Sequence, residues 1–336
     1  FPKKIIRGYK RMKESEIRPK DLFDKYLRLS SEDAKTYFPE GRRASIPCPA
    51  CCQTESQFAF NKNGFDYTEC ADCATVYLSP RPPLGEFEAF YSESPSARFW
   101  VKEFFPVVVE ARREKIFRPN AEKIQSICRD RKLEVNTIID VGAGYGIFLD
   151  EWKKSAPETQ LIAIEPLPDL SEICQSKGIH VIPSIAEKAG NLEMKGNLVV
   201  CFEVIEHVHD PFLFVKVIRQ MVAPGGLAVI TGLGVDGFDI QVLWENSKSI
   251  FPPHHINFMS ADGFSRLFKR AGFSDVEVMT PGKLDMDIVL NNQEFITKDN
   301  RFVKTLLSRG EDAMNDFQKL LAKHQLSSHC WILASN

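Results

Sequence analysis

A glycine-rich turn between a short apolar run and an amphipathic segment constrains this chain more than any other feature. Residues 137–141 read Thr-Ile-Ile-Asp-Val, and glycines follow at alternate positions. This pattern predicts a buried parallel strand, a tight turn and a helix N-terminus. Glycine suits the turn because a Cβ would keep a ligand away from the backbone. The spacing D-x-G-x-G-x-G, over Asp140, Gly142, Gly144 and Gly146, differs from the G-x-G-x-x-G of dinucleotide folds.

Strands and helices alternate after this turn. Residues 160–164 predict a second strand that ends in Glu165. An acid at the tip of the second strand, about 20–25 residues after a glycine loop, can accept hydrogen bonds from both hydroxyls of a ribose. Further strands are expected at 180–182, 197–202, 227–231, 276–279 and 330–334, and helices at 145–155, 168–177, 211–222 and 261–271. The alternation predicts an α/β fold with a mainly parallel sheet.

Three features in this order resemble the class I S-adenosylmethionine-dependent methyltransferases. They are the glycine loop, Glu165, and the run from Cys201 to Pro211 that precedes Ala-Pro-Gly-Gly at 223–226, as in ubiquinone-biosynthesis enzymes. The resemblance implies a Rossmann-like, seven-stranded sheet whose antiparallel last strand inserts between strands five and six. It also implies S-adenosylmethionine as the cofactor, held by Asp140, Gly142, Gly144, Gly146, Glu165, Pro166, Ala186, Phe202 and Glu203.

Residues 45–82 carry a metal-binding pattern. Two C-x-x-C pairs are separated by aromatic runs at 58–60 and 65–67, which are joined by the turn sequence Asn-Lys-Asn-Gly. This layout is typical of a zinc ribbon with a hairpin between its knuckles. The expected ligands of a structural Zn²⁺ are Cys48, Cys51, Cys70 and Cys73, and Cys52 leaves the register of the first pair open. A closed four-cysteine site has no free position for a substrate.

The remaining segments suggest four parts of the chain. Residues 1–44 are expected to form a basic tail and a helix with Asp21 as its N-cap, followed by the ribbon at 45–82. Residues 83–135 predict a helical linker or lid, broken at Phe105-Pro106, whose stretch 91–100 is either a substrate loop or a helix connection. Residues 136–336 would form the methyltransferase domain, and a helical insertion at 283–328 would cover the acceptor pocket or make a homodimer contact.

The composition argues against nucleic acid and membranes as binding partners of the protein. Of the 336 residues, 43% are hydrophobic and 26% are charged, and the formal net charge is −2. This balance argues against nucleic-acid binding by the whole protein, and a solvated tail explains the basic start better than a nucleic-acid or membrane arm does. No apolar run reaches the about 18 residues of a membrane span. No signal peptide is evident, and the scattered cysteines suggest a reducing compartment, so we expect a cytoplasmic protein.

Histidines are the candidate catalytic groups. A sulfonium donor is already activated, so a base is needed only when the acceptor must lose a proton, and histidine suits that task near neutral pH. His207 and His209 follow the fourth strand, and His254 and His255 follow the fifth. His209 fits a solvated or capping residue better than a catalytic one.

The ribbon, the methyltransferase core and the segment Pro-Pro-His-His-Ile-Asn-Phe-Met-Ser together resemble the zinc-containing sugar C-methyltransferases. That family has Tyr-His-Glu-His in the corresponding segment, with the second histidine as the proposed base. The resemblance therefore places the base at His255, whereas His254 stands where the family has glutamate. Tyr91 lies near the position of a substrate-loop tyrosine of that family.

These features favour an enzyme that methylates a small molecule, such as a sugar or a polysaccharide or natural-product precursor, on carbon or oxygen. An RNA methyltransferase that uses the ribbon for recognition is the first alternative. The mildly acidic composition and the missing N/D-P-P-Y/F motif after the fourth strand speak against it. A cofactor-binding scaffold without turnover is the second alternative, and the polar histidine pairs speak against that.

Overall fold

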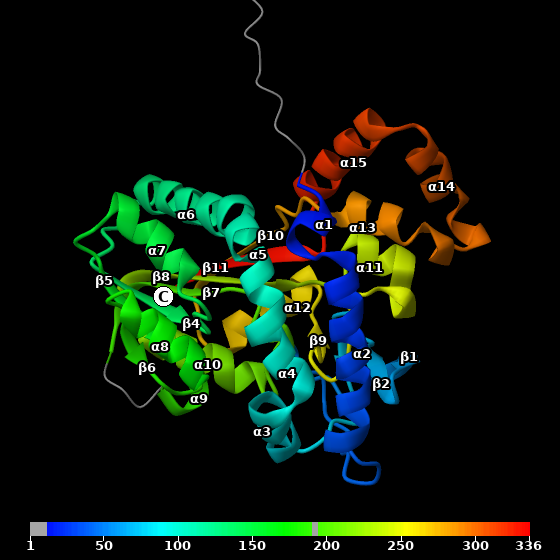
Figure 1. The fold of residues 1–336 in the computed structure, drawn as a ribbon, viewed down its shortest axis with the longest axis horizontal. Helices are drawn as coiled ribbons and strands as arrows, with labels where there is room; N and C mark the ends of the chain where they lie inside the picture. Colours follow the sequence, from blue (N-terminus) through cyan, green and yellow to red (C-terminus); the bar gives the residue numbers. More distant parts are fainter. Residues whose placement is uncertain (1–11, 190–193) are drawn as a thin grey trace, which may run out of the picture.

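The computed structural model describes residues 12–189 and 194–336. The basic residues at the start of the sequence, which we predicted to form a solvated tail, include Lys3, Lys4, Arg7, Lys10 and Arg11 and lie outside the described residues. Figure 1 shows a central sheet with helices on both sides, a second sheet beside it, and a group of helices near the end of the chain.

A seven-stranded sheet forms the centre of the molecule. Its strand order is β10-β11-β8-β7-β4-β5-β6, and β11 runs antiparallel to both of its neighbours. The strands are β4 (Thr137–Val141), β5 (Gln160–Ile164), β6 (His180–Ile182), β7 (Gly196–Cys201), β8 (Val222–Leu233), β10 (Asp275–Met279) and β11 (His329–Ser335). The last strand thus lies between the fifth and sixth strands of the sheet. The predicted Rossmann-like methyltransferase fold is confirmed.

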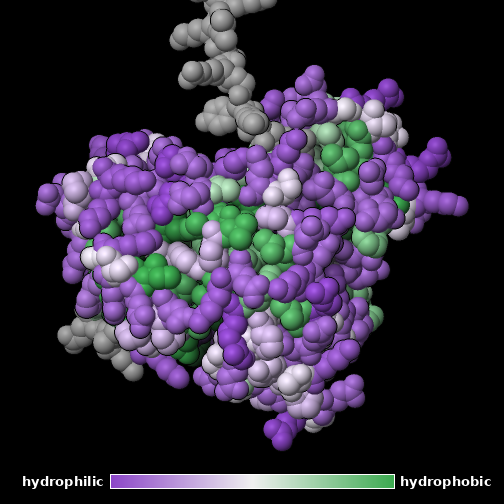
Figure 2. All heavy atoms as spheres, in the orientation of Figure 1, coloured by the Kyte–Doolittle hydropathy of each residue, from purple (hydrophilic) through white to green (hydrophobic). Residues whose placement is uncertain are grey.

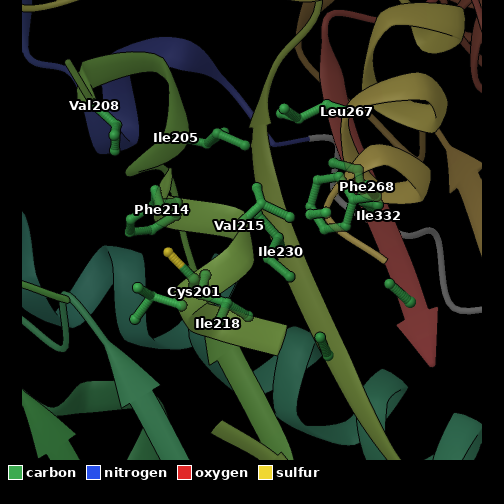
Figure 3. Packing of buried hydrophobic residues seen from close by; sticks show 14 of the residues in the cluster. Cys201, Ile205, Val208, Phe214, Val215, Ile218, Ile230, Leu267, Phe268 and Ile332 are labelled. Carbon is green, nitrogen blue, oxygen red and sulfur yellow. The ribbon is translucent and has the colours of Figure 1, made fainter. Parts of the chain in front are cut away.

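The two faces of this sheet are covered by different helices. Ile138, which points to one face, packs with α6 (Arg118–Asp130), α7 (Ile147–Ser155) and α8 (Pro168–Ser176). Ile139 points to the other face and packs with α9 (Ala186–Ala189), α10 (Pro211–Met221) and α12 (Ala261–Arg270). Figure 3 shows Phe214 and Ile218 of α10 against Cys201 and Ile230 of the sheet. Successive residues of these strands point to opposite faces, and both sets are apolar because helices cover both faces of the sheet.

A smaller sheet contains the cysteine pairs. Its order is β1 (Ser56–Lys62), β2 (Phe65–Cys70), β3 (Val76–Leu78) and β9 (Asn257–Phe258). The predicted hairpin is confirmed by the antiparallel pairing of β1 with β2. The last two strands were not expected. In their pairing Val76 lies opposite Phe258, so the segment after β8 completes the sheet of the ribbon.

Helices from the first part of the chain pack beside both sheets. They are α1 (Glu14–Ile17), α2 (Lys20–Tyr37), α3 (Leu84–Glu93), α4 (Pro95–Phe99) and α5 (Phe105–Arg112), with π-helical segments η1 (Trp100–Phe104) and η2 (Arg113–Phe117). The predicted break at Phe105-Pro106 is wrong, because helical structure continues from Pro95 to Asp130. A wider π turn precedes each internal proline and accommodates the missing N–H. Asp21 is not the N-cap of α2; Pro19 holds that position, and Asp21 lies in the first turn.

The stretch expected to be a helical insertion contains α13 (Asp285–Asn291), η5 (Gln293–Phe295), η6 (Lys298–Asn300), α14 (Arg301–Ser308) and α15 (Glu311–Lys323). These helices lie between β10 and β11 and have apolar clusters of their own, such as Met286 with Met314 and Leu321. In Figure 1 they stand apart from the central sheet. Within the described residues, no helix combines the length and apolarity that a membrane crossing requires.

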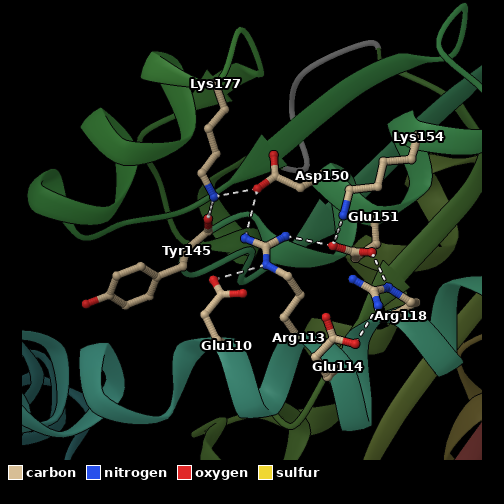
Figure 4. Close-up of polar contacts among 9 residues, drawn as sticks. All are labelled: Glu110, Arg113, Glu114, Arg118, Tyr145, Asp150, Glu151, Lys154 and Lys177. Carbon is tan, nitrogen blue, oxygen red and sulfur yellow. Dashed lines mark hydrogen bonds and ion pairs between the residues drawn. The ribbon is translucent and has the colours of Figure 1, made fainter.

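A cluster of charges joins the helical segment to the first helix after the glycine turn (Figure 4). Arg113 of η2 donates to Glu151 of α7 at 2.8 Å, and Arg118 donates to the other oxygen of the same carboxylate at 3.0 Å. Lys154 also binds Glu151 at 2.6 Å. Burial raises the pKa of Glu151, but these three hydrogen bonds outweigh it and hold the pKa at about 2.

We expect Glu151→Gln to lower the free energy of unfolding near pH 7 by about 2 kcal/mol, after allowance for the solvent exposure of its partners. A pKa depressed in the folded state contributes stability that is full above the pKa of the unfolded chain and is lost as the pH falls toward 2. The difference between the wild type and Glu151→Gln should therefore shrink below about pH 4.5. Urea unfolding from pH 7 to pH 3.5 measures it. Glu110→Gln, at the exposed edge of the cluster, is the control, and an equal loss in both variants would contradict the assignment.

Candidate active site

The glycine turn adopts the backbone that the sequence requires. Gly142, Gly144 and Gly146 have φ angles of 74°, 55° and 66°, a region that favours glycine. At Gly142 a Cβ would also come within 2.7 Å of the side chain of Val204. Gly146 is the N-cap of α7, so the turn passes directly from β4 into the helix. A Cβ at Gly144 would meet nothing within 4 Å, so this part of the turn faces open space at the carboxyl end of β4.

Asp140 and Glu165 lie beside the turn in different hydrogen-bonding states. The two oxygens of Glu165 accept from the backbone N–H of Gly144 at 2.8 Å and of Leu167 at 3.0 Å. In Asp140, which is 2% exposed, Oδ1 is buried and has no hydrogen-bond partner among the described residues. Burial, and next the nearby Glu165, raise the pKa of Asp140 to about 8. A positively charged amino group would satisfy this carboxylate.

The other predicted cofactor residues lie at the same edge of the sheet. Ala186 is buried at the start of α9, and Pro166 is exposed directly after β5. The ring of Phe202 lies 4.8 Å from that of Phe148, measured between centroids. Glu203 has a φ of 53°, and its Oε1 accepts from the Thr231 hydroxyl at 2.7 Å. All of these residues follow parallel strands, whose carboxyl ends bind ligands in open α/β sheets.

The structure brings together all four predicted catalytic residues, Tyr91, His207, His254 and His255. His207 belongs to η3 (Ile205–His207), which follows β7, and its ring centroid lies 4.6 Å from that of His255. The Tyr91 hydroxyl lies 3.2 Å from His207 Nδ1 and donates to the backbone carbonyl of His254 at 3.3 Å. Tyr91 comes from α3, so the helical segment supplies one side of this group.

His255 is held in one orientation by its neighbours. Its Nδ1 lies 2.6 Å from the Ser249 carbonyl, an acceptor, so Nδ1 carries the proton and Nε2 keeps a lone pair. The Tyr67 hydroxyl of the ribbon sheet donates to the His255 carbonyl at 2.5 Å. Burial, followed by the nearby His207, lowers the pKa of His255 well below its ordinary value. The ring is therefore neutral near pH 7, with Nε2 as its acceptor.

His254 and His209 contact other parts of the protein in ways that favour a structural role. The His254 side chain is buried among aromatic rings, with its centroid 4.6 Å from that of Phe90 and 5.2 Å from that of Tyr26. His254 Nε2 lies 3.4 Å from the Ser96 hydroxyl. His209 Nε2 lies 3.0 Å from the Pro82 carbonyl, and the N-cap of α10 is Asp210, so His209 is not the helix cap that was expected as one of its roles. The catalytic role of His254 stays a prediction, and its contacts favour support of its neighbours.

Sequence reasoning missed Arg81, which connects the ribbon to both histidine segments. This guanidinium is 3% exposed and donates to the carbonyl of His209 at 2.6 Å and to Oδ1 of Asn257 at 2.7 Å. Asn257 in turn donates to the Val208 carbonyl at 2.8 Å. Burial lowers the pKa of Arg81 to about 10, so it remains charged at neutral pH. In the sequence, only the position of Arg81 between Pro80 and Pro82 could have suggested a special role for this residue.

Arg81→Met should lower the free energy of unfolding by about 3 kcal/mol, because several buried carbonyls lose charge-assisted hydrogen bonds at once. Urea unfolding of the variant against the wild type measures the loss. The exposed Arg42 provides the control, and Arg42→Met should change stability by less than about 0.5 kcal/mol. Equal stabilities for both variants would show that Arg81 does not hold these segments together.

The four predicted zinc ligands converge. Their sulfur atoms all lie within 4.8 Å of one another, with Cys48 and Cys73 3.6 Å apart and Cys51 and Cys70 3.5 Å apart. Zn–S bonds of about 2.3 Å in a tetrahedron require sulfur separations of about 3.8 Å, so the set suits zinc with little movement. Cys52 is exposed and lies outside this set, with its sulfur 2.6 Å from Arg270 Nη2.

The two cysteine pairs pack directly on helix α12 beside the central sheet. Arg270 at the end of α12 donates to the Ala50 carbonyl at 2.5 Å, and the Ser260 hydroxyl at the start of α12 donates to the Cys73 carbonyl at 2.5 Å. Gly263 faces Thr75, where a Cβ would come within 2.3 Å of the Thr75 hydroxyl. The ribbon therefore shares its packing with the central sheet rather than standing on a flexible tether.

Comparison with known proteins agrees with this geometry. A family model described as a methyltransferase domain matches residues 112–278, just under half of the chain. Over 105 residues the chain is 31% identical to ubiquinone biosynthesis O-methyltransferases of Escherichia coli and Citrobacter koseri. The match covers 30% of this chain and 44% and 43% of those two enzymes, so the chain spans less than half the length of the curated relatives it matches.

Solved structures of methyltransferases also superpose on the chain. One is the plantazolicin methyltransferase BpumL in complex with SAH, with a TM-score of 0.48 and 14% identity over 74% of this chain and 94% of that one. Another is the sugar N-methyltransferase KedS8 from a Streptoalloteichus species, with a TM-score of 0.34 and 20% identity over 38% and 53%. These likenesses are too distant to carry any conclusion about substrate.

Proposed function

We propose that this protein transfers a methyl group from S-adenosylmethionine to a small-molecule acceptor, such as a sugar or a polysaccharide or natural-product precursor, on carbon or oxygen. The main support is one arrangement in the central sheet. The glycine turn and Asp140, whose Oδ1 has no partner among the described residues, follow β4, while His207 follows the neighbouring β7, beside His255 and beside Tyr91 of α3. A donor and an acceptor bound at that edge would be neighbours.

The cofactor side would use the turn and its two acids. Asp140 offers a buried carboxylate for the cofactor's amino group, and the glycine turn, formed by Gly142, Gly144 and Gly146, would lie against its methionine part, with open space at Gly144. Glu165 would exchange a hydrogen bond with the turn for the ribose hydroxyls. S-adenosylmethionine supplies a methyl group on a sulfonium that is already activated for transfer. Pro166, Ala186, Phe202 and Glu203 would line the rest of the cofactor site.

On the acceptor side, His255 would act as the base. Its Nε2 takes the proton that the acceptor loses when its oxygen or carbon bonds to the methyl group. The Ser249 carbonyl keeps the ring in the tautomer that leaves this lone pair free. Tyr91 and His207 would orient the acceptor or share the proton through their contact. Positioning and the exclusion of water provide the rest of the rate enhancement.

The surroundings of these histidines favour a small acceptor. His255 is 6% exposed, and Phe251 and Phe258 pack beside its ring. Figure 2 shows hydrophobic side chains within a hydrophilic rim, between the part with α7 and α8 and the part with α2 and α4. A ring or short chain would fit such surroundings better than a folded RNA would. The matched curated relatives are named as enzymes of ubiquinone biosynthesis.

In the proposed enzyme each segment of the chain would have its own role. Residues 45–82 would form the zinc ribbon with a structural Zn²⁺ on Cys48, Cys51, Cys70 and Cys73. Residues 83–135 would close the acceptor side, to which α3 contributes Tyr91. The methyltransferase domain would span residues 136–336, and its insertion at 283–328 would contact a second copy or cover the acceptor.

Transfer of labelled methyl from S-adenosylmethionine into a size-fractionated extract of the source cells tests this function. We expect label in the low-mass fraction, and none when the extract or the protein is left out. Label in RNA would favour the nucleic-acid alternative. Binding of the cofactor with no label in any fraction would favour a scaffold.

Cofactor affinity should depend on pH through Asp140. The raised pKa, about 8, means that Asp140 is mostly protonated in the free protein at neutral pH. The cationic cofactor favours the ionised form, so the affinity for S-adenosylmethionine should rise about 25-fold between pH 6.5 and pH 8.5. Titration calorimetry across this range measures it. Asp140→Asn should bind more weakly and lose the rise, and a rise that persists in this variant would assign the effect to the ligand's own amine.

A further inference from the structure

A second group of potential metal ligands lies on the acceptor side, away from the cysteines. One ring nitrogen each of His207 and His255 and one carboxylate oxygen of Glu206 all lie within 4.8 Å of one another. We infer that these three residues form a site for a divalent transition-metal cation, and that the cation inhibits methyl transfer when bound. The inhibition rests on the proposed function, whereas the binding does not.

Glu206 provides the first independent observation. It is 1% exposed, and its Oε2 is buried without a hydrogen-bond partner among the described residues. A carboxylate without partners in an apolar interior is costly, so such groups generally bind a charge. The neighbouring Gly232 leaves room for this side chain, since a Cβ there would lie 3.2 Å from Glu206 Oε2.

The two rings are held as metal-binding histidines usually are. In such sites the second ring nitrogen donates to a carbonyl, a carboxylate or a similar acceptor, which fixes the ring and leaves the first nitrogen for the metal. His255 Nδ1 meets this condition at the Ser249 carbonyl, 2.6 Å away. His207 Nδ1 lies 3.2 Å from the Tyr91 hydroxyl, which would be its acceptor when the ring carries its proton on Nδ1. Nε2 of each ring then remains for a ligand.

Two imidazoles and one carboxylate suit a particular class of cation. Zn²⁺, Co²⁺, Ni²⁺ and Fe²⁺ accept this ligand set, whereas Mg²⁺ prefers oxygen alone and Cu⁺ prefers sulfur. Metal–ligand bonds of about 2.0–2.2 Å require the three atoms to approach to about 3.3 Å, which small side-chain rotations can provide. Three protein ligands also leave a fourth position for water or an acceptor oxygen.

The same geometry explains why the cation would inhibit. Nε2 of His255 has one lone pair, and the proposed reaction uses it to accept the acceptor's proton. A cation bound to this lone pair takes the base away. Transfer should therefore fall by the contribution of a general base, about 10²–10⁴-fold, as the site fills.

Titration of the full-length zinc-loaded protein with Co²⁺ tests the site. We expect one additional equivalent of Co²⁺ with absorption typical of nitrogen and oxygen ligands and without thiolate charge-transfer bands. Methyl transfer should fall as the equivalent binds. Glu206→Gln should weaken this binding at least tenfold, whereas the exposed control Glu245→Gln should bind as the wild type does.

Three other results would contradict the metal site, the inhibition or the proposed methyl transfer. If no additional equivalent binds, or if Glu206→Gln binds Co²⁺ as tightly as the wild type, the site does not exist. If Co²⁺ binds and transfer rises, the cation is not an inhibitor. If the metal-free site supports no transfer but Co²⁺ still binds, the proposed function fails while the metal site stands. Circular dichroism and cofactor binding of Glu206→Gln confirm that the variant is folded.

Discussion

His255→Gln should lower methyl transfer by about 10²–10⁴-fold while the affinity for S-adenosylmethionine stays within about twofold. Glutamine has a similar volume and can keep a hydrogen bond to the Ser249 carbonyl, but its amide cannot accept the acceptor's proton. The residue lies after β8, away from the glycine turn that would bind the cofactor. Single-turnover transfer and titration calorimetry on the same preparation separate the two effects.

Two comparisons make this prediction specific. His324→Gln changes an exposed histidine after α15 and should leave transfer unaltered. His207→Gln should cause a smaller loss than His255→Gln, since His207 would orient rather than accept the proton. Full activity of His255→Gln would exclude it as the base. A parallel loss of cofactor binding would show that the substitution disturbs the fold.

Loss of the predicted structural zinc should strongly lower the stability of the protein. Structural zinc contributes about 10–16 kcal/mol to the folding of isolated zinc-finger peptides. Here the small sheet also has a buried apolar cluster, with Phe65, Tyr67 and Leu78 among its members. We expect Cys70→Ser, or treatment with a strong chelator, to unfold the cysteine loops at both ends of the hairpin and to loosen β3. Because β3 pairs with β9, the segment with His254 and His255 would lose its support, and transfer would be lost.

Metal content, thermal unfolding and limited proteolysis measure this loss without reference to activity. Cys52→Ser is the matched control, because Cys52 lies outside the ligand set and should leave one zinc bound. If Cys70→Ser kept its zinc and its thermal stability, the cysteine cluster would not be a zinc site. If instead Cys52→Ser lost zinc, the first knuckle would use the other register.

The sequence predicted those strands, turns and site residues that a short stretch of neighbouring residues defines. The strand at 137–141, the glycine turn and the acid at Glu165 follow from short patterns, and each lies where that pattern placed it. The order of the sheet came from the family resemblance, since spacing alone cannot pair distant strands. The helical continuity through Pro106 was missed, because a π turn absorbs the proline that normally ends a helix.

The features missed at the site depend on contacts between distant segments. The two-residue strand β9 has no periodicity of its own and exists because β3 offers it an edge. Arg81 has significance only through the carbonyls that surround it in the folded chain. Likewise, the neighbouring residues Glu206 and His207 gain a third partner from a segment almost fifty positions later, at His255. Local patterns in one sequence cannot predict such contacts between distant segments.

A crystal structure of the protein with bound SAH would show whether the glycine turn and the histidines belong to one active site. We expect the amino acid part of SAH at Asp140 and the glycine turn, its ribose at Glu165, and its sulfur directed toward His207 and His255. A gap between that sulfur and His255 Nε2 that one acceptor group could fill would support the proposed function. SAH bound elsewhere, or with its sulfur turned away from these histidines, would rule out His255 as the base at a shared site.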